Sequence, residues 1–130
     1  ENMPEDKHVV AMMALCEKVL EPIREHFGKP IMVNSGYRSA ALCRAIGSKS
    51  SSQHCKGQAV DIEIPGVANA ELAQYIANSL DYDQLILECY ERAKGPSSGW
   101  VHVSYVGDAN RKESLTYDRV NGYRRGLIYT

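Results

Sequence analysis

An α+β fold, with helices packed against a mostly antiparallel central sheet, is predicted by the order of patterned segments in this chain. That order is helix, strand, helix, strand, helix, strand, strand and a terminal hairpin. The segments predict more helices than a doubly wound parallel sheet could accommodate. The later strands are consecutive, which favours antiparallel pairing. A length of 130 residues fits one domain, so we expect a single domain over residues 1–130.

The composition is that of a globular protein without a strongly charged surface. Hydrophobic residues make up 44% and charged residues 24% of the chain, and the formal net charge is −1. This balance does not favour binding to nucleic acid or to an anionic membrane. No apolar run approaches the roughly 20 residues that span a bilayer, and the acidic residues 1–6 lack the apolar core of a signal peptide.

The N-terminal segment predicts a helix over residues 6–27, because its apolar residues recur at intervals of three and four. Pro22 lies inside this pattern and should kink the helix or break it near Glu21, because proline lacks a backbone N–H group. Gly28 provides a stop signal at the C-terminal end.

A strand and a second helix follow. Residues 31–33 form a short apolar run that predicts a strand, and residues 34–36 predict a turn. Ser39 is expected to cap a short helix that extends through Ile46. The composition of residues 47–53 predicts a loop.

The middle of the chain predicts a strand over residues 58–64 and a helix over residues 69–80. Strand residues alternate between two faces, and Asp61 and Glu63 share the polar face. Asn69 is expected to cap the helix, because an asparagine side chain can accept a hydrogen bond from the first turn.

The last part of the chain predicts strands only. Residues 84–89 form an apolar run, and residues 100–106 alternate between apolar and polar side chains. Asn121-Gly122 is a hairpin signal between segments 115–120 and 123–129, so a C-terminal hairpin is expected over about residues 114–129.

The four cysteines do not indicate a cysteine-rich zinc site, because none of them forms a C-x-x-C pair. We expect Cys16, Cys43 and Cys89 to be buried thiols that pack as small hydrophobic residues, and Cys55 adjoins His54. Four free thiols would favour a reducing compartment.

Two histidines and an aspartate form the candidate site. Asp61 and His102 lie on the polar faces of two predicted strands, and His54 precedes the first of them across Gly57, where the backbone can turn tightly or approach a neighbour. Imidazole and carboxylate groups are ligands of a catalytic zinc ion, which keeps a fourth position for water. Taken by spacing alone, the same three residues also fit ordinary structural roles in a strand, and both interpretations stay open.

The sequence resembles the zinc D-Ala-D-Ala carboxypeptidase and L-alanyl-D-glutamate peptidase family, which includes phage endolysins and shares its fold with hedgehog domains. Three segments carry the resemblance over about residues 31–106. The upstream S-G-Y-R-S is residues 35–39, and the downstream W-V-H is residues 100–102. The central pattern S-x-H-x-x-G-x-A-x-D matches Ser52, His54, Gly57, Ala59 and Asp61.

The resemblance implies a zinc peptidase that acts on the stem peptides of peptidoglycan, at the bacterial cell wall or in the periplasm. His54, Asp61 and His102 would be the zinc ligands, and Ser52 would line the substrate site. Arg38 would contact the substrate carbonyl group or a carboxylate, a role that suits the fixed donors of a guanidinium group. A phage or a bacterial origin, several stem-peptide bonds and any oligomeric state fit the sequence equally.

The general base is the part that departs from the family pattern. Many members have an acidic residue three positions before the last histidine, where this chain has Gly99. Glu88, which closes the apolar strand before His102, is the first replacement candidate, Glu63 is the second and Asp108 is a distant third.

Two interpretations follow from that departure. If Glu88 replaces the missing residue, the protein is an active zinc peptidase, in which Glu88 and Arg38 are catalytic. If nothing replaces it, the alternative is a zinc-containing but inactive domain that binds peptidoglycan or has a structural role. The arginines of the tail, which lies beyond the resemblance, are interpreted as a solvated face and not as part of a site.

Overall fold

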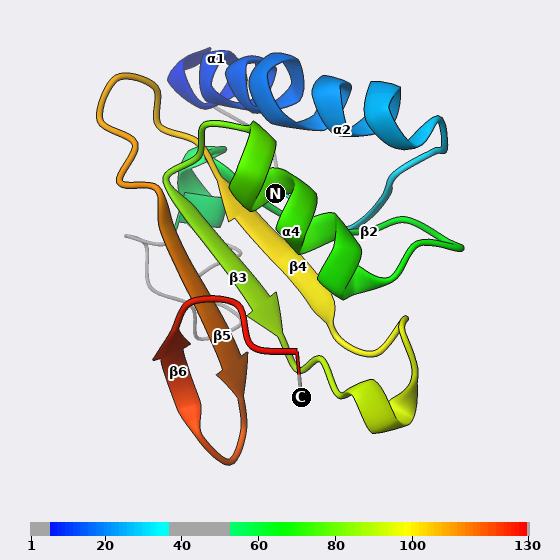
Figure 1. Ribbon diagram of the computed structural model, residues 1–130. Coiled ribbons are helices and arrows are strands. Elements are labelled where there is room, and N and C mark those ends of the chain that lie inside the picture. Colours follow the sequence, from blue (N-terminus) through cyan, green and yellow to red (C-terminus); the bar gives the residue numbers. More distant parts are fainter. Residues whose placement is uncertain (1–5, 37–52, 130) are drawn as a thin grey trace.

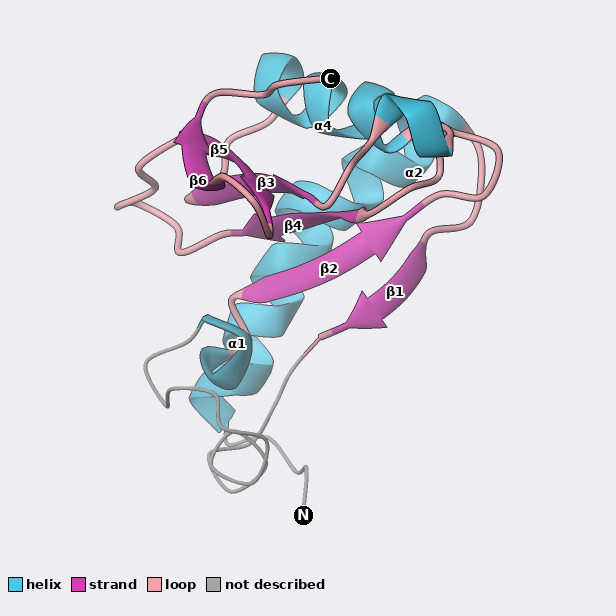
Figure 2. Ribbon diagram, turned by 90° about the horizontal axis from the view of Figure 1, so that it is seen from below, coloured by secondary structure: helices cyan, strands magenta, loops and turns pink. Residues whose placement is uncertain are grey.

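A computed structural model describes residues 6–36 and 53–129 and contains one mixed sheet of six strands. The strand order is β1-β2-β4-β3-β5-β6 (Figure 2), and every neighbouring pair is antiparallel except β3 and β5. The predicted α+β class with a mostly antiparallel sheet is therefore confirmed. The strands are β1 (Met32–Ser35), β2 (Ala59–Glu63), β3 (Gln84–Glu88), β4 (Trp100–Ser104), β5 (Glu113–Asp118) and β6 (Gly122–Arg125).

The described helices cover one face of the sheet. In Figure 1, α4 (Asn69–Ser79) lies across β3 and β4, while α1 (Asp6–Leu15) and α2 (Glu21–Phe27) follow each other above it. Short 3-10 helices occupy Gln53–Lys56 and Arg92–Lys94. No described helix has both the length and the apolar content that crossing a membrane requires.

The core lies between these helices and the apolar faces of the three central strands. Alternation along each strand places one set of side chains toward the helices, where each buried residue contributes on the order of 1.5–3 kcal/mol. The strand residues of this core are Val60, Ile62, Leu85, Leu87, Val101 and Val103. They pack with Leu15, Val19, Ile23, Leu72 and Ile76 from the helical layer. The opposite face of the sheet is therefore free to carry polar groups.

The N-terminal helical segment is interrupted as predicted, but by a π-helical turn over Cys16–Leu20. Pro22 follows this turn in the first residues of α2, where its missing N–H group costs no hydrogen bond of that helix. The N–H group of Glu21 bonds to the carbonyl oxygen of Cys16, which closes the wider turn. Gly28 ends α2 in a left-handed conformation, as predicted.

Two local predictions are corrected by tertiary contacts. Residues 34–35 continue strand β1 instead of turning, because β1 is an edge strand whose exposed Asn34 side chain donates to the Glu63 carboxylate at 2.7 Å. Asn69 is the first residue of α4 and not its cap, since the N-cap is Ala68. The buried Asn69 amide instead donates to the carbonyl oxygens of Ser98 and Gly99.

The cysteine prediction is partly wrong. Cys16 is a free thiol but is exposed, because it lies on the outer side of the π-helical turn, and Cys89 is half-buried. Cys55 is buried and disulfide-bonded, so the chain does not carry four free thiols, and the inference of a reducing compartment loses its basis. Cys43 and the predicted helix at residues 39–46 lie outside the described residues.

The C-terminal hairpin is present and is shifted from its predicted bounds. Asn121-Gly122 forms the turn, with Gly122 already the first residue of β6, and the Asp118 carboxylate accepts hydrogen bonds from the backbone N–H groups of Val120 and Asn121. The hairpin is attached to the sheet through the parallel pair of β5 with β3.

The connection from β3 to β4 passes so close to β3 that Gly99 cannot carry a side chain. Its φ is +68°, and a Cβ atom there would lie 2.0 Å from the carbonyl oxygen of Glu88 and 2.6 Å from the carbonyl carbon of Cys89. A backbone atom cannot move aside as a flexible side chain can. An acidic residue three positions before His102 is therefore excluded by the fold of this chain.

We predict that Gly99→Ala lowers the free energy of unfolding by about 3 kcal/mol or more, since it adds a backbone clash to left-handed strain. Gly122 is the matched control, because it has the same φ of +68° but open space around it. Gly122→Ala should cost only about 1 kcal/mol. Urea unfolding of both variants measures the difference, and equal losses would mean that the close approach is wrong.

Candidate metal centre

Strand pairing places two of the three predicted ligands directly opposite each other. In the antiparallel pair of β2 and β4, Asp61 is the partner of His102. Residues paired in this way project from the same face of a sheet. Because their neighbours Val60, Ile62, Val101 and Val103 face the helices, Asp61 and His102 project from the opposite face.

The third residue, His54, comes from the short 3-10 helix before β2 and is 5% exposed. Gly57 sets this helix against α1, because a Cβ atom at Gly57 would lie 2.6 Å from the carbonyl oxygen of His8. The φ of Gly57 is +71°, which also allows the tight turn into β2. Gly57 therefore provides both the tight turn and the close approach to a neighbouring segment that were expected from the sequence.

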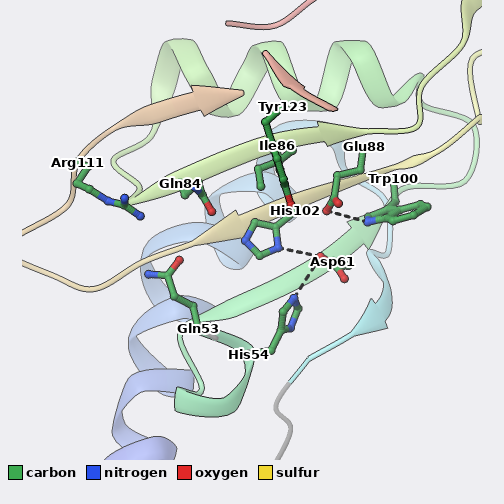
Figure 3. A pocket seen from close by; sticks show the side chains of 10 residues that line it. All are labelled: Gln53, His54, Asp61, Gln84, Ile86, Glu88, Trp100, His102, Arg111 and Tyr123. Carbon is green, nitrogen blue, oxygen red and sulfur yellow. Dashed lines mark hydrogen bonds and ion pairs between the residues drawn. The ribbon is translucent and has the colours of Figure 1, made fainter. Parts of the chain in front are cut away.

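The three side chains converge on one point (Figure 3). His102 Nδ1 lies 3.0 Å and His54 Nε2 3.4 Å from the same oxygen, Oδ1, of Asp61. One possible ligand atom from each residue lies within 4.8 Å of the others. This nitrogen and carboxylate donor set fits zinc, which takes three protein ligands at catalytic sites, and does not fit the all-oxygen shells of magnesium or calcium.

The hydrogen bond on the far side of His54 fixes how its ring can act. Nδ1 lies 2.9 Å from the carbonyl oxygen of Gly36, which can only accept a hydrogen bond. Nδ1 therefore carries the proton in the neutral ring, and the lone pair of Nε2 faces Asp61. Metal-binding histidines in proteins are oriented by an outer hydrogen bond of this kind.

Asp61 keeps its negative charge in this setting. Burial raises the pKa of its carboxyl group, but the hydrogen bond from His102, and the hydrogen bond from His54 and the charges of both rings when they are protonated, outweigh burial. The pKa of Asp61 falls to about 2. The carboxylate is therefore available as an anionic ligand at any pH near neutrality.

The cluster opens into a cavity of about 500 Å³ on the polar face of the sheet, a size in the range of small-ligand sites. Its floor consists of alternate residues of β3, namely Gln84, Ile86 and Glu88. The remaining lining residues are Gln53, His54, Asp61, Trp100, His102, Arg111 and Tyr123.

Glu88, the first candidate for the general base, lies in this cavity. It pairs with Trp100 across β3 and β4, and the Trp100 indole donates from Nε1 to Glu88 Oε2 at 3.1 Å. Burial raises the pKa of the Glu88 carboxyl group, which suits a group that must accept and release a proton.

The two other candidates for the general base, Glu63 and Asp108, do not line this cavity. The Glu63 carboxylate accepts hydrogen bonds from Asn34 at 2.7 Å and from Asn69 at 3.3 Å, and it does not line the cavity. Asp108 is exposed and is also not a lining residue. Arg38 and Ser52 lie outside the described residues.

An ion pair between exposed Arg111 and buried Asp83 lies at the far end of the cavity and was not predicted from the sequence. Arg111 donates to Asp83 from Nε at 3.0 Å and from Nη2 at 2.9 Å, and Gln53 donates to the same carboxylate at 2.8 Å. Asp83 is 3% exposed. Because Gln53 adjoins His54, this network ties the 3-10 helix that carries His54 to the residue before β3. Asp83 follows Tyr82 in the sequence, and no motif around it predicted the ion pair with Arg111.

A small sheet with two histidines and a carboxylate facing a polar cavity defines a candidate metal-dependent hydrolase. A family model described as Peptidase M15 matches residues 3–104, and the chain belongs to this peptidase family. The resemblance drawn from the sequence motifs is thereby confirmed. Among the curated proteins compared with the chain, none matches. Strands β5 and β6 lie beyond the matched residues.

We predict that the purified protein binds about one equivalent of zinc and that His102→Ala or Asp61→Ala abolishes tight binding, because each removes one of three ligands. His26→Ala is the control, since His26 is exposed on α2 and stacks on Tyr75. Elemental analysis after dialysis measures the bound metal. Binding should also weaken at low pH, where the histidines are protonated. Unchanged zinc content in His102→Ala would exclude this site.

Asp83 gives a prediction for stability. Hydrogen bonds from Arg111 outweigh the effect of burial and lower the pKa of Asp83 from 3.8 to about 2. A carboxyl group with a lowered pKa stabilises the fold above its ordinary pKa, and this stabilisation is lost as pH falls from about 5 toward 2. Asp83→Asn should therefore lower the free energy of unfolding by about 1–2 kcal/mol at pH 7 and by roughly half as much at pH 3.

Urea unfolding at both pH values checks the Asp83 prediction. Glu91→Gln is the control, because Glu91 forms an exposed ion pair with Lys94, which contributes little. A loss in Asp83→Asn that is equal at pH 7 and pH 3 would show that the ionised carboxylate is not the stabilising group.

Proposed function

We propose that this protein is a zinc peptidase that hydrolyses an amide bond in the stem peptide of peptidoglycan, with Glu88 as its general base. The observation that carries the proposal is the common cavity of Glu88 and the His54–Asp61–His102 cluster. Membership of the Peptidase M15 family supports peptide hydrolysis. The peptidoglycan substrate rests on the resemblance carried by the motifs around His54, Asp61 and His102.

When bound to the three ligands, zinc would polarise the scissile carbonyl group and lower the pKa of a water molecule. His54, held by Gly36, and Asp61, held as an anion, keep the ligand atoms facing one point. Glu88 accepts the proton of the attacking water and passes it to the nitrogen of the scissile amide. The C–N bond then breaks, and the products are a carboxylate and an amine.

Contacts of the Glu88 side chain support this role. Trp100 holds Oε2 in place, so Oε1 is the oxygen assigned to proton transfer. The raised pKa brings the carboxyl group closer to the working range of a general acid and base near neutral pH. Because the backbone leaves no room for a side chain at Gly99, the neighbouring strand supplies the carboxylate instead.

Arg38 and Ser52 complete the proposed site on the basis of their motifs. Arg38 would stabilise the negative charge that develops on the carbonyl oxygen, and removal of one such donor typically lowers the rate by about 10²–10³. Ser52 would line the substrate site two residues before His54. Both a carboxypeptidase and an endopeptidase, including a phage lysis enzyme, fall within the proposal.

A second function is favoured by one observation, the absence of an acidic residue at position 99. In that alternative the protein binds zinc and peptidoglycan but cleaves nothing. The carboxylate of Glu88 in the cavity argues against it, because a purely structural zinc site needs no such group beside it.

We predict that the zinc-loaded protein releases new amino groups from purified sacculi and that Glu88→Gln lowers the rate by about 10²–10⁴. Glutamine preserves the size of the side chain but cannot accept the proton. Zinc content should be unchanged, since Glu88 is not among the clustered ligands.

Glu63→Gln is the matched control for this experiment. Glu63 lies on β2 two residues after Asp61, and its carboxylate is held by Asn34 and Asn69 away from the cavity lining. The rate at which Glu63→Gln releases amino groups should stay close to that of the wild type. Binding to sacculi without release of amino groups, at any pH with zinc bound, would support the non-catalytic alternative instead.

A further inference from the structure

The C-terminal hairpin forms one side of the cavity, although it lies beyond the residues matched by the family model. The match ends at residue 104, whereas the cavity is also lined by Arg111 and by Tyr123 of β6. The hairpin reaches this position because β5 pairs with β3 in parallel, next to the strand that carries Glu88. Residues beyond the family match therefore line the same cavity as His54, Asp61 and His102.

Sheet register determines where Tyr123 projects. Trp100 pairs with Glu88, Glu88 with Tyr117, and Tyr117 with Tyr123, which gives one continuous row across four strands. Residues in such a row share a face of the sheet. Trp100, the member of this row on β4, lies two residues before His102. Tyr123 is therefore on the same face of the sheet as His102 and Asp61.

The Tyr123 side chain points into the cavity. In Figure 3 it extends from β6 across Ile86 toward His102 and Glu88. The Tyr117 ring lies against it, with ring centroids 4.7 Å apart, and supports its orientation. Burial, together with the nearby Glu88 carboxylate, raises the pKa of Tyr123, so its hydroxyl group remains a hydrogen-bond donor at neutral pH.

Other polar donors that line the cavity already have partners. The Trp100 indole donates to Glu88, the Gln84 amide donates to Glu113, and the Gln53 amide donates to Asp83. Arg111 donates to Asp83 from Nε and Nη2, and its Nη1 lies 3.7 Å from a Glu113 carboxylate oxygen.

Within residues 6–36 and 53–129, no hydrogen bond uses the Tyr123 hydroxyl group, and 62% of the residue is exposed. Its hydroxyl group is therefore a side-chain donor of this described part of the cavity that has no hydrogen-bond partner and can bond to a substrate.

We infer that the Tyr123 hydroxyl group donates a hydrogen bond to the carbonyl oxygen of the amide that is cleaved at the metal centre. The inference rests on the proposed peptidase function and adds a substrate contact from the hairpin. The carbonyl oxygen gains negative charge as water attacks. A donor beside this oxygen stabilises the charged transition state more strongly than it stabilises the neutral substrate. The effect of Tyr123 should therefore appear mainly in kcat.

The test compares Tyr123→Phe with Tyr117→Phe in the zinc-loaded protein. Each variant loses one hydroxyl group from the same row, but Tyr117 is not a lining residue of the cavity. Rates are measured on sacculi and on a synthetic stem pentapeptide. Tyr123→Phe should lower kcat by about 10- to 100-fold with little change in KM, while Tyr117→Phe stays within about twofold of the wild type.

A binding measurement separates this inference from the proposed function. Phosphinic analogues of D-Ala-D-Ala and of L-Ala-D-Glu carry charged oxygens where the tetrahedral oxyanion would form, and calorimetry gives their affinity without turnover. Tyr123→Phe should weaken binding of the preferred analogue by about tenfold or more, with unchanged zinc content.

Each outcome is decisive. If the wild type cleaves and Tyr123→Phe matches it in kcat and in analogue affinity, the hydrogen bond is wrong and the peptidase function stands. If the wild type cleaves nothing but Tyr123→Phe binds an analogue more weakly, the contact is supported and the peptidase function fails. If the wild type cleaves nothing, and either binds neither analogue or binds one no better than Tyr123→Phe does, both are overturned.

Discussion

The pairing of Asp61 with His102 across β2 and β4 is the constraint on which the candidate site depends. Because side chains alternate along a strand, a slip of either strand by one residue would turn its member of this pair into the apolar core. The fully buried neighbour on that strand, Ile62 beside Asp61 or Val101 beside His102, would then face solvent. The same burial that stabilises the fold therefore fixes the positions of Asp61 and His102 in the candidate metal site, and His54 needs only one short helix to reach them.

Two parts of the sequence build the two sides of the cavity. The residues within the Peptidase M15 match provide the cluster and Glu88, while the connection after β4 and the terminal hairpin provide Arg111 and Tyr123. The two parts are joined by the buried Asp83 carboxylate, which binds both Arg111 and Gln53. A hairpin on an outer strand can change without disturbing the central strands. Under the proposed function, the catalytic groups and a substrate contact would come from separable parts of the chain.

The sequence was sufficient where one side-chain pattern decided the structure. Alternation in β2 and β4 placed Asp61 and His102 on a common polar face, and the end of an apolar run placed Glu88. Asn69 was misjudged because its amide is used by a loop about 30 residues away and not by its own helix. The contribution of Tyr123 could not be foreseen, because periodicity does not reveal that β5 pairs with β3 in parallel.

The cavity lies on the face of the sheet, where the backbone groups of β2, β4, β3 and β5 are already paired with one another. A peptide entering it cannot join the sheet as an added strand, which is how many domains hold ordinary extended peptides. Under the proposed function, the described part of the cavity would recognise a peptide through side chains and through the proposed metal. A binding mode of this kind would not require L-residues or regular α-peptide linkages in the substrate. The alternating chirality and the side-chain-linked glutamate of a stem peptide could then be accommodated without loss of backbone contacts.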